Sequence, residues 1–133
     1  MTCVLTLAAL AMSGCGESPP ASDPAPKKLA EGVGLDAKSM YEAQCVSCHG
    51  ATGAGDGSMA GMLPTKPRSF GAAEWRFVDF TAGDAAIRAE VTRVIREGIA
   101  DVMMPGYVGE PTDAEMSALV EYVLELRRAE RRE

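Results

Sequence analysis

Apolar side chains recur at helical spacing in three segments of the chain, and the pattern predicts an amphipathic helix in each. The first helix begins at Asp36, a preferred N-cap residue, and runs through Gln44 and beyond. Leu35 and Met40 have the spacing of a hydrophobic staple at its start. Steps of three and four residues place the following side chains on one side of this helix: Ala37, Tyr41, Cys45 and Cys48.

The other two predicted helices have clearer apolar stripes. The second covers about residues 84–97 and ends before Gly98, where a terminating glycine belongs; its stripe consists of Ile87, Val91, Val94 and Ile95. The third begins with a capping box between Thr112 and Glu115. Its stripe consists of Met116, Leu119, Val120, Val123 and Leu124. The charged end, RRAERRE, is interpreted as a solvated helix terminus.

A long segment rich in Gly and Pro, residues 50–83, separates the first two helices. Loops of this length are unusual in a compact domain unless they cover something. Residues 75–80 (WRFVDF) come nearest to strand alternation, but the pattern is too weak to predict a sheet. The fold class predicted is therefore all-α, with three main helices and long loops around a small core.

The N-terminus has the pattern of an export signal. Residues 4–12 are apolar but far shorter than the ~20 residues that span a bilayer. The sequence Ser13-Gly14-Cys15 resembles a bacterial lipoprotein cleavage site, so we expect a signal peptide over residues 1–14 and lipidation of Cys15. An ordinary signal with an unrelated Cys15 is the alternative. The implied location is periplasmic, with the chain anchored to a membrane through the lipid.

Residues 15–34 have the composition of a linker, and the folded domain is expected over residues 35–133. The linker lacks apolar periodicity and contains four prolines: Pro19, Pro20, Pro24 and Pro26. The whole chain has 19 acidic and 13 basic residues, a net charge of −6. This balance argues against nucleic acid as a partner, because phosphate binding depends on clustered Lys and Arg. It suits an encounter with a basic protein surface.

The segment QCVSCHG contains the Cys-x-x-Cys-His signature of covalent haem attachment. A three-residue step on a helical turn presents Cys45 and Cys48 to the same side, and His49 can then ligate the iron. A zinc site would need further ligands, and a thioredoxin-type pair would need a βαβ pattern; neither is present. A structural disulfide would leave His49 unexplained. One motif predicts one haem c.

The second axial ligand is less directly specified. His49 is the only histidine, so ligation by two histidines within the chain is excluded. Met104 is favoured among eight methionines, because Pro105 restricts the preceding residue to extended backbone and so fixes its direction. Met103 and an open coordination site remain alternatives.

Together these stretches resemble class I cytochromes c: residues 35–57 (LDAKSMYEAQCVSCHGATGAGDG), 64–70 (PTKPRSF), 94–107 (VIREGIADVMMPGY) and 117–123 (SALVEYV). The resemblance implies the cytochrome c fold, in which Tyr41 meets Leu119 and Tyr122 where the first and last helices cross. It also implies Met104 as the iron ligand. A carbonyl of Leu63 or Pro64 would accept the second ring N–H of His49. Trp75 and Arg68 could reach a haem propionate, or could serve as core packing and a solvated charge.

The expected function is that of an exported, membrane-tethered monohaem electron carrier rather than an enzyme. Its partners would be a redox protein donor and a redox protein acceptor. One alternative is a haem enzyme or a gas or peroxide sensor with an open or displaceable sixth ligand. Another is a fixed cytochrome subunit of a dehydrogenase or oxidase. Because the helices are short and aromatics are few, we also expect the chain without haem to be largely unfolded.

Overall fold

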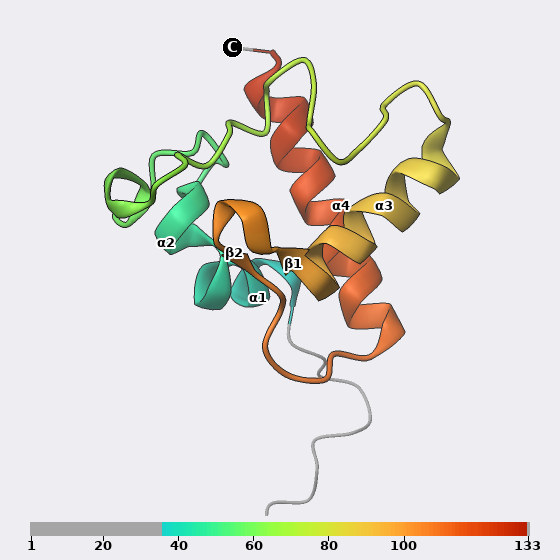
Figure 1. The fold of residues 1–133 in the computed structure, drawn as a ribbon. Helices are drawn as coiled ribbons and strands as arrows, with labels where there is room; N and C mark the ends of the chain where they lie inside the picture. The colour runs from blue at the N-terminus through green and yellow to red at the C-terminus, as the bar shows by residue number, and fades with distance from the viewer. Residues whose placement is uncertain (1–35, 133) are drawn as a thin grey trace, which may run out of the picture.

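The computed structural model describes residues 36–132. Four predictions therefore lie outside the described residues: the signal peptide, the lipidation of Cys15, the linker of residues 15–34 and the staple residue Leu35. Four α-helices form the framework, α1 (Ala37–Gln44), α2 (Val46–His49), α3 (Asp84–Glu97) and α4 (Asp113–Glu130) (Figure 1). No helix in this part of the chain is long and apolar enough to cross a membrane.

The helix boundaries follow the capping residues that the sequence predicts. The Asp36 carboxylate accepts a hydrogen bond from the Ser39 backbone N–H at 3.0 Å and so caps α1. Thr112 and Glu115 form the complete capping box at the start of α4. Gly98 ends α3 with φ 73°, a conformation that favours glycine. All three predicted starts and stops are confirmed to within a residue.

The first predicted helix is divided in two at Cys45. This residue ends α1 and begins α2, with φ −113° and ψ −36°. Two single 3-10 turns complete the helical content, η1 (Ala60–Met62) and η2 (Ala100–Val102). Apart from η1, the long segment between α2 and α3 has no helix, as its Gly and Pro content predicts.

One small sheet is present where the sequence predicts none. The strands β1 (Gly98–Ile99) and β2 (Met104–Pro105) pair antiparallel, with Gly98 opposite Pro105 and Ile99 opposite Met104. Two-residue strands are too short to show alternation, which is why the pattern misses them. The WRFVDF segment forms only an isolated bridge between Trp75 and Val78.

The core lies where α1 and α3 pack against α4. The rings of Tyr41 and Tyr122 meet edge to face with centroids 5.5 Å apart, and Leu119 is fully buried beside them. This confirms the helix crossing that the family resemblance implies. The apolar stripe predicted for α4 is buried along its whole length: Met116, Leu119, Val120, Val123 and Leu124.

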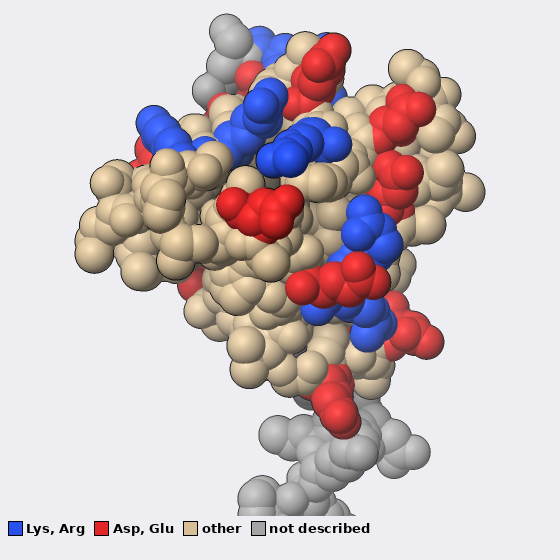
Figure 2. All heavy atoms as spheres, viewed as in Figure 1, with Lys and Arg blue, Asp and Glu red and all other residues tan. Residues whose placement is uncertain are grey.

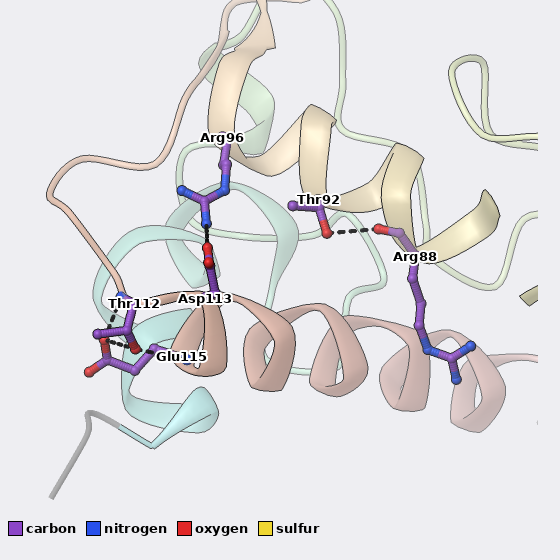
Figure 3. A network of polar contacts seen from close by, with 6 residues as sticks. All are labelled: Arg88, Thr92, Arg96, Thr112, Asp113 and Glu115. Atoms are coloured by element: carbon purple, nitrogen blue, oxygen red, sulfur yellow. Dashed lines mark hydrogen bonds and ion pairs between the residues drawn. The ribbon is translucent and has the colours of Figure 1, made fainter. Parts of the chain in front are cut away.

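Polar contacts also fasten α3 to α4 (Figure 3). Arg96 Nη2 donates to Asp113 Oδ1 at 3.0 Å. Arg88 also forms an ion pair with Glu121 of α4. The Thr92 hydroxyl donates to the Arg88 carbonyl at 2.8 Å within α3. The two ion pairs between the helices are half-exposed or exposed, so each adds little stability.

The interpretation of the C-terminal end as solvated is wrong for its first residue. Arg127 is 7% exposed, and its guanidinium donates to the carbonyls of Phe70, Ala72 and Ala73 at 2.7, 2.5 and 3.2 Å. It also lies over the Phe80 ring at 3.6 Å. The loop after residue 69 supplies carbonyls that replace water around the charge, so burial is tolerated.

Candidate functional site

The haem-attachment motif occupies one tight turn. Both the Cys48 and the His49 backbone N–H groups donate to the Cys45 carbonyl, at 3.1 and 2.9 Å. The two cysteines are half-buried free thiols. Burial, followed by the charge of Cys48, raises the pKa of the Cys45 thiol to about 11. The thiols are therefore one helical turn apart, as their spacing predicts.

One cavity of about 650 Å³ collects the candidate residues. Cys45 lines it from the junction of α1 and α2, Cys48 and His49 line it from α2, and Met104 lines it from β2. Its other walls come from the residue 63–78 loop, from α3 and from α4, and are largely apolar: Leu63, Phe70, Phe77, Val78, Val91, Val94, Ile95 and Val123. The volume is within the range of about 300–1,000 Å³ common for ligand sites.

One nitrogen of the His49 ring has no hydrogen-bond partner in the described residues. Burial lowers its pKa, which favours the neutral imidazole with a free lone pair. Its Nδ1 is buried and has no hydrogen-bond partner within residues 36–132. The expected bond to a carbonyl of Leu63 or Pro64 is therefore wrong in this structure. The imidazole packs instead against Phe70, with ring centroids 4.9 Å apart.

The two neighbouring methionines differ in how they are held. Met103 has a left-handed backbone with φ 59° and is 60% exposed. Met104 is half-buried and pairs with Ile99 in the hairpin. Both line the cavity, but only Met104 has the extended backbone of a paired strand. This difference favours Met104 over Met103 as an iron ligand.

Trp75 and Arg68 both line the cavity, and each side chain already makes one hydrogen bond within the described residues. The Trp75 indole N–H donates to the Phe70 carbonyl at 3.1 Å, and its ring packs between Phe70 and Phe80. Arg68 Nη1 lies 3.5 Å from the Glu74 carbonyl oxygen. Core packing therefore accounts for Trp75, whereas Arg68 keeps other N–H groups for a second partner.

Basic residues gather beside the cavity although the chain is acidic overall. Lys66, Arg68 and Arg76 all line it. Figure 2 shows Lys and Arg side chains over the upper part of the view, where Figure 1 places the residue 50–83 loop and the end of α4. The charged side chains that line the cavity are thus basic, although the chain as a whole has a net charge of −6.

Sequence reasoning missed two residues of the site, Phe70 and Gln44. Phe70 contacts His49, and the signal that could have found it is an aromatic inside a segment rich in Gly and Pro. Gln44 bonds the backbone of Val108, 64 residues away, and no local pattern indicates such a contact.

The residues of the cavity fit a covalently attached haem. Two thiols one turn apart, a neutral imidazole with an unpartnered buried nitrogen and a thioether face a largely apolar space. Nitrogen and sulfur are the axial donors that such haems use. In residues 36–132 there is no group of three or more His, Cys, Asp or Glu side chains that could hold a metal ion.

Comparisons with known proteins agree with this geometry. Residues 34–123 match the family described as cytochrome c oxidase, cbb3-type, subunit III. Among solved structures, the chain is similar to one from the reducing HAO-like protein complex of Kuenenia stuttgartiensis, with 26% identity and a TM-score of 0.55. The similarity covers 71% of this chain and 43% of that one, so this chain spans less than half the length of its neighbour. No significantly similar sequence was found among curated proteins.

The family match extends over more than half of the chain and includes the motif, the hairpin and most of the apolar stripe of α4. The chain therefore belongs to the cbb3-type cytochrome c oxidase subunit III family, a family of c-type cytochromes, which implies covalently bound haem c.

Proposed function

We propose that this protein is an exported monohaem electron carrier that passes single electrons between larger redox complexes. The observation that carries the proposal is the convergence of Cys45, Cys48, His49 and Met104 on one cavity. A bound haem supplies a reversible one-electron change at its iron. The protein supplies attachment, axial ligands and an apolar surround.

Each of the four residues has a distinct role in this proposal. The thiols of Cys45 and Cys48 would hold the haem covalently, each by adding across one vinyl group so that the sulfur bonds to one carbon and the hydrogen goes to the other. His49 provides the nitrogen ligand, and its lowered pKa supports ligation by the neutral ring. Met104 provides a soft, neutral sulfur ligand, which favours Fe(II) and raises the potential relative to a second imidazole.

The attachment is tested by intact-mass measurement of the exported protein. We expect the added mass of one haem in the wild-type protein and none in Cys45→Ala/Cys48→Ala. Wild-type protein without the added mass would contradict the proposal.

The closed coordination is tested by adding CO to the reduced protein. With both axial positions filled, we expect little binding by the wild-type protein and by Met103→Ala, and rapid binding by Met104→Ala. Rapid binding by the wild-type protein at neutral pH would support the alternative of an enzyme or sensor with an open site.

The proposal includes a membrane tether, with a signal peptide over residues 1–14, lipidation at Cys15, a linker over residues 15–34 and the cytochrome domain over residues 35–133. Its support is the cleavage-site resemblance at Ser13-Gly14-Cys15. Cell fractionation is the test: Cys15→Ala should move the protein from the membrane to the soluble periplasmic fraction, and an unchanged distribution would contradict lipid anchoring.

A fixed subunit of a larger redox assembly is the second candidate. It is supported by the description of the matched family as an oxidase subunit and by the structural neighbour, which is a chain of a protein complex. Purification from mildly solubilised membranes distinguishes the two. A free carrier should elute alone, whereas a subunit should co-purify with its partners in fixed ratio.

A further inference from the structure

The segment that carries Met104 is fastened to α3 on one side. Met104 pairs with Ile99 in the hairpin, and the Tyr107 N–H donates to the Ile95 carbonyl at 2.8 Å. These bonds connect the segment to the end of α3, which directly precedes it. They do not connect it to the turn that holds Cys45, Cys48 and His49.

That second connection is made by the Gln44 side chain. Its Nε2 donates to the Val108 carbonyl at 2.9 Å, and its Oε1 accepts from the Val108 N–H at 2.8 Å. The Gln44 side chain also hydrogen-bonds with the Tyr107 side chain, so within residues 36–132 the hydrogen bonds that join α1 or α2 to residues 104–112 all come from Gln44. Gln44 directly precedes Cys45, so the amide links the start of the haem motif to the chain four residues after Met104.

Packing does not replace these bonds at Val108. Its side chain is 76% exposed, so burial adds little to hold the backbone there. Met103, which directly precedes Met104, is also exposed and has a left-handed backbone. The Gln44 amide thus supplies the contacts that hold Val108 against the motif, whereas Tyr107 beside it packs against the core.

We propose that Gln44 is a positioning residue for the sixth ligand: by clamping the Val108 backbone, it keeps the Met104 segment closed against the helix that carries the haem motif. The inference rests on the proposed ligation by His49 and Met104. Because the thioether is neutral, no net charge draws it to the site, and its ligation depends on the segment that delivers it. Without the clamp the segment opens more often and admits a competing small ligand.

The test uses the full-length haem protein as wild type, Gln44→Ala and Glu42→Ala. Glu42 is the matched control, because it is exposed on the same helix and pairs only with Lys38 in the described part of the chain. We measure the rate of CO binding to the reduced form, the absorption that a sulfur ligand gives ferric haem, and unfolding in guanidinium. Gln44→Ala loses the two hydrogen bonds to the Val108 backbone. Because their loss makes opening of the segment easier, we expect the CO binding rate to rise about tenfold.

A purely structural role would shift global unfolding without raising the CO rate in the folded protein. The expected result is instead a faster CO rate for Gln44→Ala at guanidinium concentrations where it remains folded, with Glu42→Ala unchanged. Wild-type rates in Gln44→Ala, with the sulfur absorption present in both proteins, would overturn this inference alone. A wild-type protein without the sulfur absorption would overturn the proposed ligation and this inference with it.

Discussion

Gly98 occupies the point where α3 turns into the hairpin that carries Met104. Its φ is 73°, and a Cβ placed there would lie 2.4 Å from the Met104 carbonyl oxygen. We expect Gly98→Ala to lower the free energy of unfolding by more than the ~1–3 kcal/mol of backbone strain, because the hairpin must also move. Guanidinium unfolding of the haem protein measures the loss, and the ferric sulfur absorption reports on Met104.

Gly83 is the matched control for this substitution. Its backbone is similar, with φ 87° and ψ 156°, but nothing lies within 4 Å of the Cβ position. Gly83→Ala should therefore show the strain without the clash and should keep the sulfur absorption. If the two variants lost the same free energy of unfolding, the hairpin would move aside at no energetic cost, which would contradict this prediction.

Tyr41 gives the haem protein a pH dependence of predictable sign. Its hydroxyl is buried and donates to the Gly50 carbonyl at 2.7 Å, and burial raises its pKa above the ordinary 10.0. Because the folded state holds this proton more tightly, the contribution is complete below pH ~10 and is lost as the pH rises further. At neutral pH, Tyr41→Phe should lower the free energy of unfolding by ~1 kcal/mol, because the hydrogen bond is lost. Between pH 8 and 11, the free energy of unfolding should then fall less steeply in Tyr41→Phe than in the wild-type protein.

Tyr122→Phe is the control for the pH series, because the Tyr122 hydroxyl makes no hydrogen bond within residues 36–132. The free energy of unfolding of Tyr122→Phe should decline with pH more nearly as that of the wild-type protein does. A Tyr41→Phe protein with the full wild-type decline would contradict the assignment.

At the scale of elements, Arg127 fastens the end of α4 to the residue 70–80 loop. Three carbonyls and the Phe80 ring surround its guanidinium. We expect Arg127→Met to lower the free energy of unfolding by ~3 kcal/mol, since hydrogen bonds to a charged group are lost and the carbonyls stay buried. Arg128→Met, which removes a half-exposed ion pair with Glu121, should cost less than ~1 kcal/mol. Guanidinium unfolding measures both variants, and a similar decrease in the free energy of unfolding for Arg127→Met and Arg128→Met would contradict this account.

The helices could be predicted from sequence because their signals are local. The capping box of Thr112 and Glu115 and the stop at Gly98 involve neighbours only a few residues apart. The buried Arg127 could not, because its carbonyl partners lie 54 to 57 residues away. The same applies to the hairpin, since two paired residues on each side show no period.

Some residues of the candidate site could also be predicted from sequence, and others could not. Cys45, Cys48 and His49 form a contiguous motif, and Pro105 singles out Met104 from the other methionines. The contact of Phe70 with His49 and the clamp from Gln44 depend on how distant segments meet. Local chemistry is therefore visible in the sequence, whereas the parts that orient it are not.

At the scale of the whole molecule, the cavity reaches into the core itself. Tyr41 of α1, Val91 of α3 and Val123 of α4 are buried core residues, and each also lines the cavity. The three main helices therefore share one interior with the proposed haem. Without the haem, the apolar side chains around this space of about 650 Å³ would lack the partner atoms that a packed core provides.

We therefore expect the chain to be largely unfolded when it is made without haem. Far-UV circular dichroism of Cys45→Ala/Cys48→Ala should show little helix and no cooperative thermal transition, because the core residues would lack partner atoms. The wild-type chain produced without haem separates the effect of the cofactor from that of the substitutions and should give the same spectrum, whereas the haem protein should be helical and cooperative. Native helicity in either haem-free chain would show that the helices are stable without the cofactor in their shared interior.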